Sequence, residues 1–200
     1  MTKKLNLTIR QGETFQKVIR WETLPIVYKA ISVITQAAPA VLTIPLHGLP
    51  TGWRATVVSA NGMEEINAVN TPPRDKDYHQ VTVKDAFTIE LNDVNAADNT
   101  AYSGGGFLQF YTPVSLAGVT AKMEIKDKVG GTILMTLTNG VPDNRIALNT
   151  SEHTITLTIS ATDTAAITWT KGVYDLEMTN ASVVTTIFSG KVSVIKEVTT

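Results

Sequence analysis

The sequence predicts an all-β protein with one short helix, and three observations support this class. Apolar and polar residues alternate along most segments, which is the period of a half-buried β-strand. Glycine, proline, asparagine and aspartate separate these segments at short intervals, as turns between strands require. After Leu116 the strands recur about every ten residues with turn signals between them, a spacing typical of a β-sandwich.

The composition excludes several classes of function. The 200 residues include 17 lysines and arginines and 18 acidic residues, which are spread along the chain and give a net charge of −1. We therefore expect no nucleic-acid partner, because no basic patch is present. We also expect no membrane partner and no export by the general secretory route, because long apolar runs are missing. The absence of cysteine excludes disulfides and thiolate metal sites.

Residues 4–21 predict a β-hairpin. The apolar residues at positions 5, 7 and 9 alternate with polar ones, Gln11-Gly12-Glu13 predicts a turn, and TFQKVIRW predicts a second strand. A hairpin alone is marginally stable in water, so we expect it to join a larger sheet.

The next segment, to about residue 111, predicts several short strands. The apolar run IVYKAISVI opens it, and the pair Asn61-Gly62 favours a tight hairpin turn. VTVKDAFTIEL predicts a second hairpin that turns at residues 84–86. The polar stretches 68–80 and 92–106 are expected to be loops, and GFLQFYTP predicts the strand that follows.

The part after Leu116 predicts the strands TAKMEI, TILMTLT, HTITLTI, GVYDLEM and SGKVSVI. Between them, SATDTAAI predicts one short helix near residues 160–168. Ser160 is its expected N-cap, and Asp163 three residues later completes a capping-box pattern.

Two resemblances to phage proteins cover nearly the whole chain. VSLAGVTAKMEIKDKVGGTILMTLT, ITLTISATDTAAITWTKGVYDLEMT and FSGKVSVIKEVT resemble an Ig-like β-sandwich module of tailed-phage tail and baseplate proteins. Such modules usually begin with an L-x-x-x-Q-G-D/E-T-F hairpin, which lies far upstream here as LTIRQGETFQKVIRW. The intervening segment is similar to a small β-barrel of phage tail proteins, through APAVLTIPLHG, GWRATVV, NGMEEIN, FTIEL and YSGG. That barrel is commonly labelled after a domain of the ubiquitin-activating enzyme, but this chain has no cysteine for a thioester.

The resemblances imply that one domain interrupts the other. Residues 1–28 plus 113–200 are expected to form a discontinuous β-sandwich, and residues 29–112 an inserted small β-barrel. The ends of the insertion must then lie close together. The strands within 4–21 must pair with strands after 116.

No stretch of the sequence predicts catalytic, cofactor-binding or metal-binding residues. His47, His79 and His153 lack neighbours at ligand spacing, and a zinc site needs three or four convergent ligands. NDVNAADN, residues 92–99, lacks the glycine and glutamate of a calcium loop and predicts Asx-turns instead. SGGG, residues 103–106, precedes a strand and not a helix, so we expect a bulge or loop exit in place of a phosphate site.

Two further features of the sequence have structural interpretations. PPRDKDYH, residues 72–79, shows no nucleophile–base pair, and we interpret it as a flexible surface loop that reaches a neighbouring subunit. The large aromatic residues are expected in core or interdomain packing and not in a ligand platform. They are Trp21, Trp53, Trp169, Phe107, Phe110 and Tyr111.

The resemblance implies a non-enzymatic structural protein of a tailed-phage virion, in the tail, baseplate or fibre-attachment region, made in the host cytoplasm. Its expected partners are itself, as a homo-oligomeric ring or trimer, and other virion tail proteins. The terminal segments 1–10 and 190–200 either add strands to partner chains or pair with each other. Alternatives are a receptor- or carbohydrate-binding module at the tail tip, or a head–tail joining or decoration protein. A glycan hydrolase is disfavoured, because no pair of carboxylates is indicated.

Overall fold

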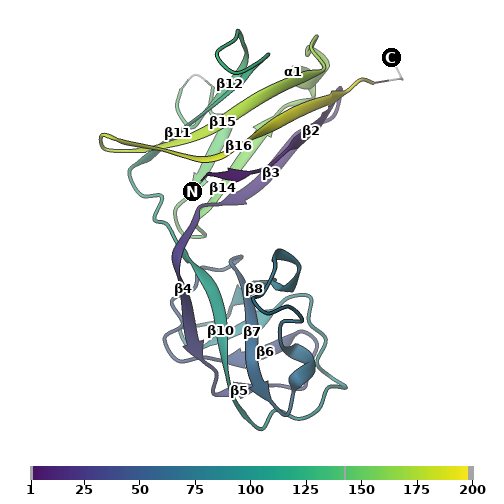
Figure 1. Cartoon of the computed structure of the whole chain (residues 1–200), viewed down its shortest axis with the longest axis vertical. Helices are drawn as coiled ribbons and strands as arrows, with labels where there is room; N and C mark the ends of the chain where they lie inside the picture. The colour runs from purple at the N-terminus through teal and green to yellow at the C-terminus, as the bar shows by residue number, and fades with distance from the viewer. Residues whose placement is uncertain (1, 142, 198–200) are drawn as a thin grey trace. The chain divides into compact units, whose positions relative to one another are not determined.

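The computed structural model describes residues 2–141 and 143–197 and confirms the predicted all-β class (Figure 1). The chain divides into two compact units. Unit 1 comprises Met1–Trp21, Ser115–Thr150 and Thr154–Thr200, and unit 2 comprises Glu22–Val114 and Ser151–His153. None of the described helices is long and apolar enough to cross a membrane.

Unit 1 consists of two sheets that share one core. The larger sheet has the order β1 (Lys3–Lys4), β16 (Val183–Ile195), β15 (Lys171–Asn180), β11 (Val119–Lys126) and β12 (Ile133–Thr138), and β2 (Leu7–Arg10) also pairs with β16. The smaller sheet has the order β13 (Ile146–Asn149), β14 (Thr154–Ile159) and β3 (Phe15–Arg20). Alternate side chains of both sheets are buried together, which agrees with a β-sandwich.

The N-terminal strands join unit 1, as the sequence predicts. β2 pairs in parallel with β16, with Leu7 opposite Val192, and β3 pairs antiparallel with β14, with Ile19 opposite Ile155. The predicted hairpin of residues 4–21 is wrong, however, because β2 and β3 lie in different sheets. Their apolar faces reach the same core from opposite sides, so the chain crosses between the sheets at Gly12, whose φ is 79°.

The terminal segments pair with each other inside unit 1. β1 and β2 both lie in parallel beside β16, so the second of the two alternatives for these segments is confirmed. Residues 198–200 lie outside the described part of the chain. Free strand edges for partner chains must therefore be sought elsewhere.

The described residues contain a single α-helix, α1 (Ala161–Ala165), which begins where the sequence predicts. Ser160 Oγ accepts a hydrogen bond from the Asp163 amide at 3.1 Å, so Ser160 is the N-cap. At the other end, Gln11 Nε2 donates to the carbonyls of Ala165 and Ile167, each at 3.0 Å. The crossing between β2 and β3 therefore caps the helix C-terminus, a contact that local sequence does not indicate.

Unit 2 contains one seven-stranded sheet. Its order is β4 (Glu22–Ala30), β10 (Gly104–Pro113), β7 (Arg54–Asn61), β8 (His79–Val83), β9 (Thr88–Leu91), β6 (Ala40–Thr43) and β5 (Val33–Ile34). Two 3-10 turns, η1 (Glu64–Ile66) and η2 (Asp75–Asp77), lie in its connections. The predicted β8–β9 hairpin is confirmed. A separate core fills this unit, and Trp53, Leu42, Ile44, Met63 and Leu108 are fully buried in it.

The first and last strands of this sheet follow each other directly in the chain. The Ile31 amide donates to Gly106 of β10, and the Ser32 amide donates to Thr43 of β6. The sheet therefore curls until its two ends are joined by the residues between β4 and β5.

The two ends of the segment that forms unit 2 lie side by side. Glu22 is paired with Pro113, and β4 continues along β10 as far as Ala30 opposite Phe107. The ends of unit 2 are thus adjacent, as an insertion requires. Residues 22–28, which the sequence analysis groups with the sandwich, lie in unit 2 because they belong to β4.

Candidate interaction surface

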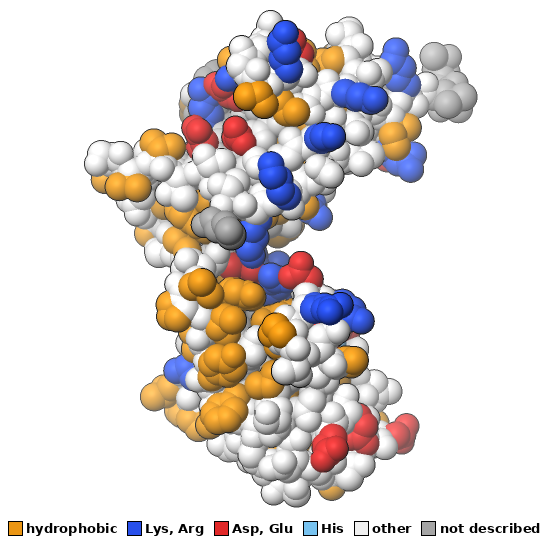
Figure 2. All heavy atoms as spheres, in the orientation of Figure 1, with side chains coloured by type: hydrophobic (Ala, Val, Ile, Leu, Met, Phe, Trp, Pro, Cys, Tyr) orange, Lys and Arg blue, Asp and Glu red, His pale blue; other side chains and the backbone are white. Residues whose placement is uncertain are grey.

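An apolar surface is exposed on the outer face of β4 and β10, where Figure 2 shows hydrophobic side chains gathered. We call it the β4 surface and define it by Leu24, Ile26, Tyr28, Ala30 and Phe107. Tyr28 and Phe107 are 53% and 44% exposed, and their rings meet edge to face with centroids 6.4 Å apart. Leu24 is 69% exposed. Exposed aromatic and aliphatic side chains gathered on one face are typical of a contact surface.

The strand register explains why these side chains share one face. Opposite residues of paired strands point to the same side, and Phe107 is opposite Ala30 while Gln109 is opposite Tyr28. The residues between them face inward, where Leu108 and Phe110 are buried in the core of unit 2. Apolar side chains therefore lie on both faces of β4 and β10, with Lys29 on the inner face and Gln109 on the outer face.

The outer edge of β4 has no strand partner among the described residues, because β4 ends the sheet. Ile31 donates its amide to β10. Since backbone direction alternates along a strand, the N–H and C=O groups of Ile26, Tyr28 and Ala30 point away from β10. The β4 surface thus combines apolar side chains with an unpaired backbone edge, the two features that strand addition uses.

A cluster formed by Gln109, Tyr78, Arg54 and Tyr111 adjoins the β4 surface on the side of β7. The Gln109 side chain is buried, and its Nε2 donates to the Tyr78 hydroxyl at 2.7 Å. Burial raises the pKa of Tyr78, although the hydrogen bond from Gln109 opposes that shift. The Arg54 guanidinium lies 5.0 Å from the centre of the Tyr78 ring and 5.9 Å from that of Tyr111.

Arg54 also holds the start of β4. Its Nε and Nη2 donate to the two carboxylate oxygens of Glu22, and its Nη1 lies 3.0 Å from Asp75 Oδ1. Burial alone would lower the pKa of Arg54, but the hydrogen bonds and charges of Glu22 and Asp75 raise it above its usual value. Arg54 therefore stays positively charged and acts as a structural tie between β7 and β4.

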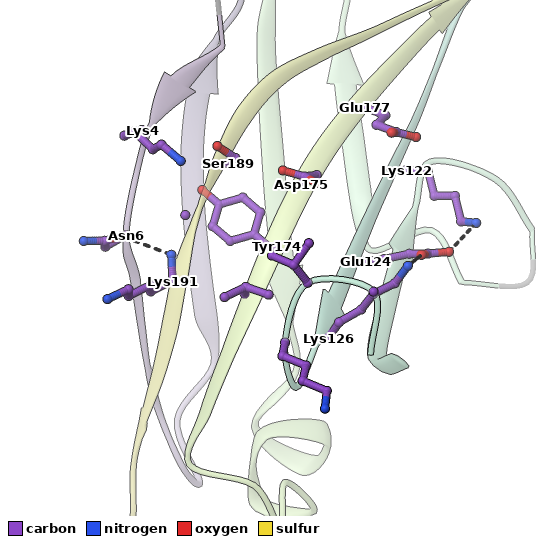
Figure 3. Close-up of a pocket in the computed structure, with 15 residues that line it drawn as sticks. Lys4, Asn6, Lys122, Glu124, Lys126, Tyr174, Asp175, Glu177, Ser189 and Lys191 are labelled. Atoms are coloured by element: carbon purple, nitrogen blue, oxygen red, sulfur yellow. Dashed lines mark hydrogen bonds and ion pairs between the residues drawn. The ribbon is translucent and has the colours of Figure 1, made fainter. Parts of the chain in front are cut away.

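A hollow of about 560 Å³ lies on unit 1, over β1, β16, β15 and β11 (Figure 3). Five lysines and three carboxylates line it: Lys4, Lys122, Lys126, Lys128, Lys191, Glu124, Asp175 and Glu177. Hydrogen bonds from Lys122 and then Lys126 lower the pKa of Glu124, and Lys126 Nζ lies 3.0 Å from its Oε2.

The aromatic residue that lines this hollow faces inward. Tyr174 is 4% exposed, and its hydroxyl donates to the Leu5 carbonyl at 2.7 Å. The hollow therefore offers charged and polar groups to a ligand but no open ring face for stacking on a sugar.

The loop at residues 92–99 and the glycines at residues 104–106 have structural roles. Asn95 Oδ1 accepts from the Ala97 amide, which confirms an Asx-turn in residues 92–99. Gly104, Gly105 and Gly106 all have positive φ and form the entry to β10, as predicted. A Cβ on Gly106 would lie 2.7 Å from Ala60 Cα, so only glycine fits this close approach.

The three histidines have different local partners. The His47 side chain is buried, its Nδ1 accepts from the Leu49 amide, and its Nε2 lies 2.8 Å from the Asp85 carbonyl. His79 Nδ1 lies 2.9 Å from Asp93 Oδ1, and His153 Nδ1 lies 2.9 Å from the Val114 carbonyl. Within residues 2–141 and 143–197, no group of three or more His, Cys, Asp or Glu could hold a metal.

The segment 72–79 is anchored by its own residues. It contains η2, where Asp77 accepts hydrogen bonds from the Arg74 amide at 2.7 Å and from Asn70 Nδ2 at 2.9 Å. The Arg74 amide is the main cause of the lowered pKa of Asp77. The segment places Tyr78 against Gln109, so it supports the outer face of the sheet.

The predicted packing of the aromatic residues is correct for most of them and wrong for Phe107. Trp53 and Phe110 are buried in unit 2, and Trp21 and Trp169 pack against the core of unit 1. Phe107 instead forms the exposed pair with Tyr28, which the sequence analysis missed. The sequence carries only a weak signal that Tyr28 is exposed, because the register of β4 depends on its pairing with β10.

No family model matches the chain, and no curated protein is significantly similar to it in sequence.

Proposed function

We propose that this protein is a non-enzymatic structural component of a tailed-phage virion, in the tail, baseplate or fibre-attachment region. It assembles through contacts with copies of itself and with neighbouring tail proteins. The β4 surface carries this proposal, because an apolar face beside an unpaired strand edge is suited to protein contacts. The sequence motifs shared with phage tail modules supply the virion context.

We also propose that unit 1 is an Ig-like β-sandwich and unit 2 a small β-barrel. Two sheets around one core support the first assignment. The direct connection between β4 and β5, the end strands of the sheet in unit 2, supports the second. Both units would act as rigid bodies that present their surfaces for repeated contacts.

The charged clusters described above have structural roles that favour assembly over catalysis. Arg54 and Glu22 tie two strands together, Asp77 holds a 3-10 turn, and Glu124 bridges two lysines. Each of these charges is accounted for by a neighbouring group of opposite charge or by a backbone amide.

Quantitative mass spectrometry of purified virions tests the proposed function. We expect peptides of this chain in purified particles of the phage that encodes it, in a fixed ratio to known tail proteins. Particles from a deletion strain should lack the peptides and should show a defective or missing tail structure. Absence of the protein from infectious wild-type virions would contradict the proposal.

A receptor- or carbohydrate-binding role is the second candidate, favoured by the hollow of unit 1 with its polar lining. A glycan array tests it, and the matched variants are Lys191→Ala in the hollow and Lys17→Ala on β3. Binding that is lost only in Lys191→Ala would support this role. A head–tail joining or decoration role has the same surface requirements, and location of the protein within the particle separates it from a tail role.

A further inference from the structure

We propose that β4 pairs edge to edge with β4 of a second copy of this chain, antiparallel about a two-fold axis. In this register Tyr28 faces the partner's Tyr28, and Ile26 faces the partner's Ala30. The inference rests on the assembling role proposed above and names both the partner and the contact.

The backbone of β4 shows why the occupant is a strand. Ile26, Tyr28 and Ala30 direct their N–H and C=O groups away from β10, and the described residues offer these groups no strand partner. In an antiparallel pair centred on Tyr28, each of these residues exchanges two hydrogen bonds with the residue opposite. The backbone N–H and C=O groups of these three residues then form hydrogen bonds on both subunits, as an isologous two-fold contact requires.

The length of the pairing is set by features at its two ends. Pro25 has no N–H, and the register shift beside it separates Thr23 from Ile26 along β10. At the other end the Ser32 amide turns to Thr43 of β6, so the open edge ends at Ala30. The pairing therefore extends from Ile26 to Ala30, and Tyr28 is its centre.

The side chains explain why the strand comes from a second copy. Ile26, Tyr28 and Ala30 are uncharged, so the two-fold register places no like charges opposite each other and sets a large residue against a small one. The nearest charges are engaged elsewhere, because Glu22 pairs with Arg54 and Lys29 Nζ donates to Leu46. An uncharged edge is best matched by another uncharged edge.

Two other sheet edges of this chain, those of β3 and β12, are protected against such pairing. β3 carries the exposed residues Gln16 and Lys17 on its open edge, a common device against edge pairing. Beside β12, Asp143 Oδ2 accepts from the Thr138 amide and Arg145 donates to the Thr136 carbonyl. β4 lacks such protection at Ile26, Tyr28 and Ala30, which favours β4 itself as the partner strand.

Sedimentation velocity of the full chain over a dilution series tests the pairing. We expect a reversible dimer in the wild type. Tyr28→Lys should raise the dimer dissociation constant at least about tenfold, the scale of losing one anchor residue. Val69→Lys is the matched control, because Val69 is an exposed apolar residue of unit 2 outside the β4 surface. A wild type that stays monomeric, or equal effects of the two variants, would overturn the inference.

Cysteine cross-linking tests the register. The chain contains no cysteine, so a single introduced thiol reports one position. Hydrogen-bonded antiparallel partners have Cα atoms about 5.5 Å apart, within disulfide range. Tyr28→Cys should therefore give a covalent dimer under mild oxidation, whereas Ala30→Cys should not. The double variant Ile26→Cys with Ala30→Cys should cross-link again, and cross-linking of Ala30→Cys alone would contradict the proposed register.

The outcomes separate this inference from the proposed function. A dimer that is insensitive to Tyr28→Lys would exclude β4 as its contact and leave a virion role intact. A monomer whose β4 amides gain hydrogen-exchange protection only when another tail protein is added would identify a different chain as the occupant, and it too would overturn the second-copy inference.

Discussion

Arg54 of β7 donates two hydrogen bonds to the carboxylate of Glu22, the first residue of unit 2, whose side chain is 4% exposed. This pair fixes β4 against the sheet at the point where the chain enters unit 2. It also lies beside Tyr78 and Tyr111, which border the β4 surface. The geometry of the proposed contact face thus depends on a partly buried ion pair.

Replacing Arg54 by methionine should lower the free energy of unfolding of unit 2 by about 2–4 kcal/mol, because the buried Glu22 loses its compensating cation. Arg54→Lys should have an intermediate effect, since lysine keeps the charge but not the two-pronged geometry. Asp75→Asn should change stability by less than about 1 kcal/mol, because Asp75 is 93% exposed. Urea denaturation followed by tryptophan fluorescence measures these differences, and similar effects of Arg54→Met and Asp75→Asn would contradict this assignment.

Unit 2 should lose stability in acid. The amide of Arg74 lowers the pKa of Asp77, and the amide of Phe87 lowers that of Asp85. A carboxylate whose folded pKa lies below its unfolded value stabilises the fold fully above the unfolded pKa, about 3.9 for aspartate. That stabilisation is lost as pH falls through the folded pKa. We therefore expect the urea midpoint of unit 2 to fall as the pH drops below about 4.

Asp77→Asn should make this acid dependence shallower and should lower stability at neutral pH. The exposed Asp98, changed to asparagine, is the control and should leave the dependence as in the wild type. Retention of the full acid dependence in Asp77→Asn would show that Asp77 is not one of its sources.

Gly106→Ala should destabilise unit 2 by at least about 2 kcal/mol, because the position combines positive φ with backbone crowding. Its φ is 78°, and an added Cβ would approach the backbone of Ala60. Gly48→Ala separates the two causes, because Gly48 has a φ of 70° but open space around it. Gly48→Ala should lower the free energy of unfolding by only about 1–2 kcal/mol. Equal losses in thermal or urea unfolding would show that crowding at Gly106 has no effect.

The contact between α1 and the β2–β3 crossing should stabilise unit 1. Thr164 Oγ1 is buried and donates to the Glu13 carbonyl at 2.8 Å. Thr164→Val keeps the shape of the side chain but removes the hydroxyl, and we expect a loss of about 1–3 kcal/mol. Thr162→Val on the exposed side of the same helix should be nearly neutral. A loss of the same size in Thr162→Val would indicate a helix-propensity effect instead.

Local patterns in the sequence predict much of this fold, because strand alternation and capping depend on neighbouring residues. The period of two marks β11, β14 and β15, and Ser160 marks the start of α1. The motif order predicts that the N-terminal strands pair with strands far along the chain. These features need no knowledge of register between distant segments.

The parts that sequence reasoning missed depend on distant contacts. Gln11-Gly12-Glu13 signals a turn but not whether the next strand stays in the same sheet, so β2 and β3 were assigned to one hairpin. Phe107 is predicted in core or interdomain packing, because the sequence alone does not show its exposure. Only its pairing with β4 shows that Phe107 and Tyr28 lie on the exposed side.

Cryo-electron microscopy of the intact particle tests the central claim most directly. The account predicts density for both β-units of this chain in the tail region, with the β4 surface buried against a neighbouring subunit in every copy. Particles without this density, or copies whose β4 surface faces solvent throughout, would contradict it.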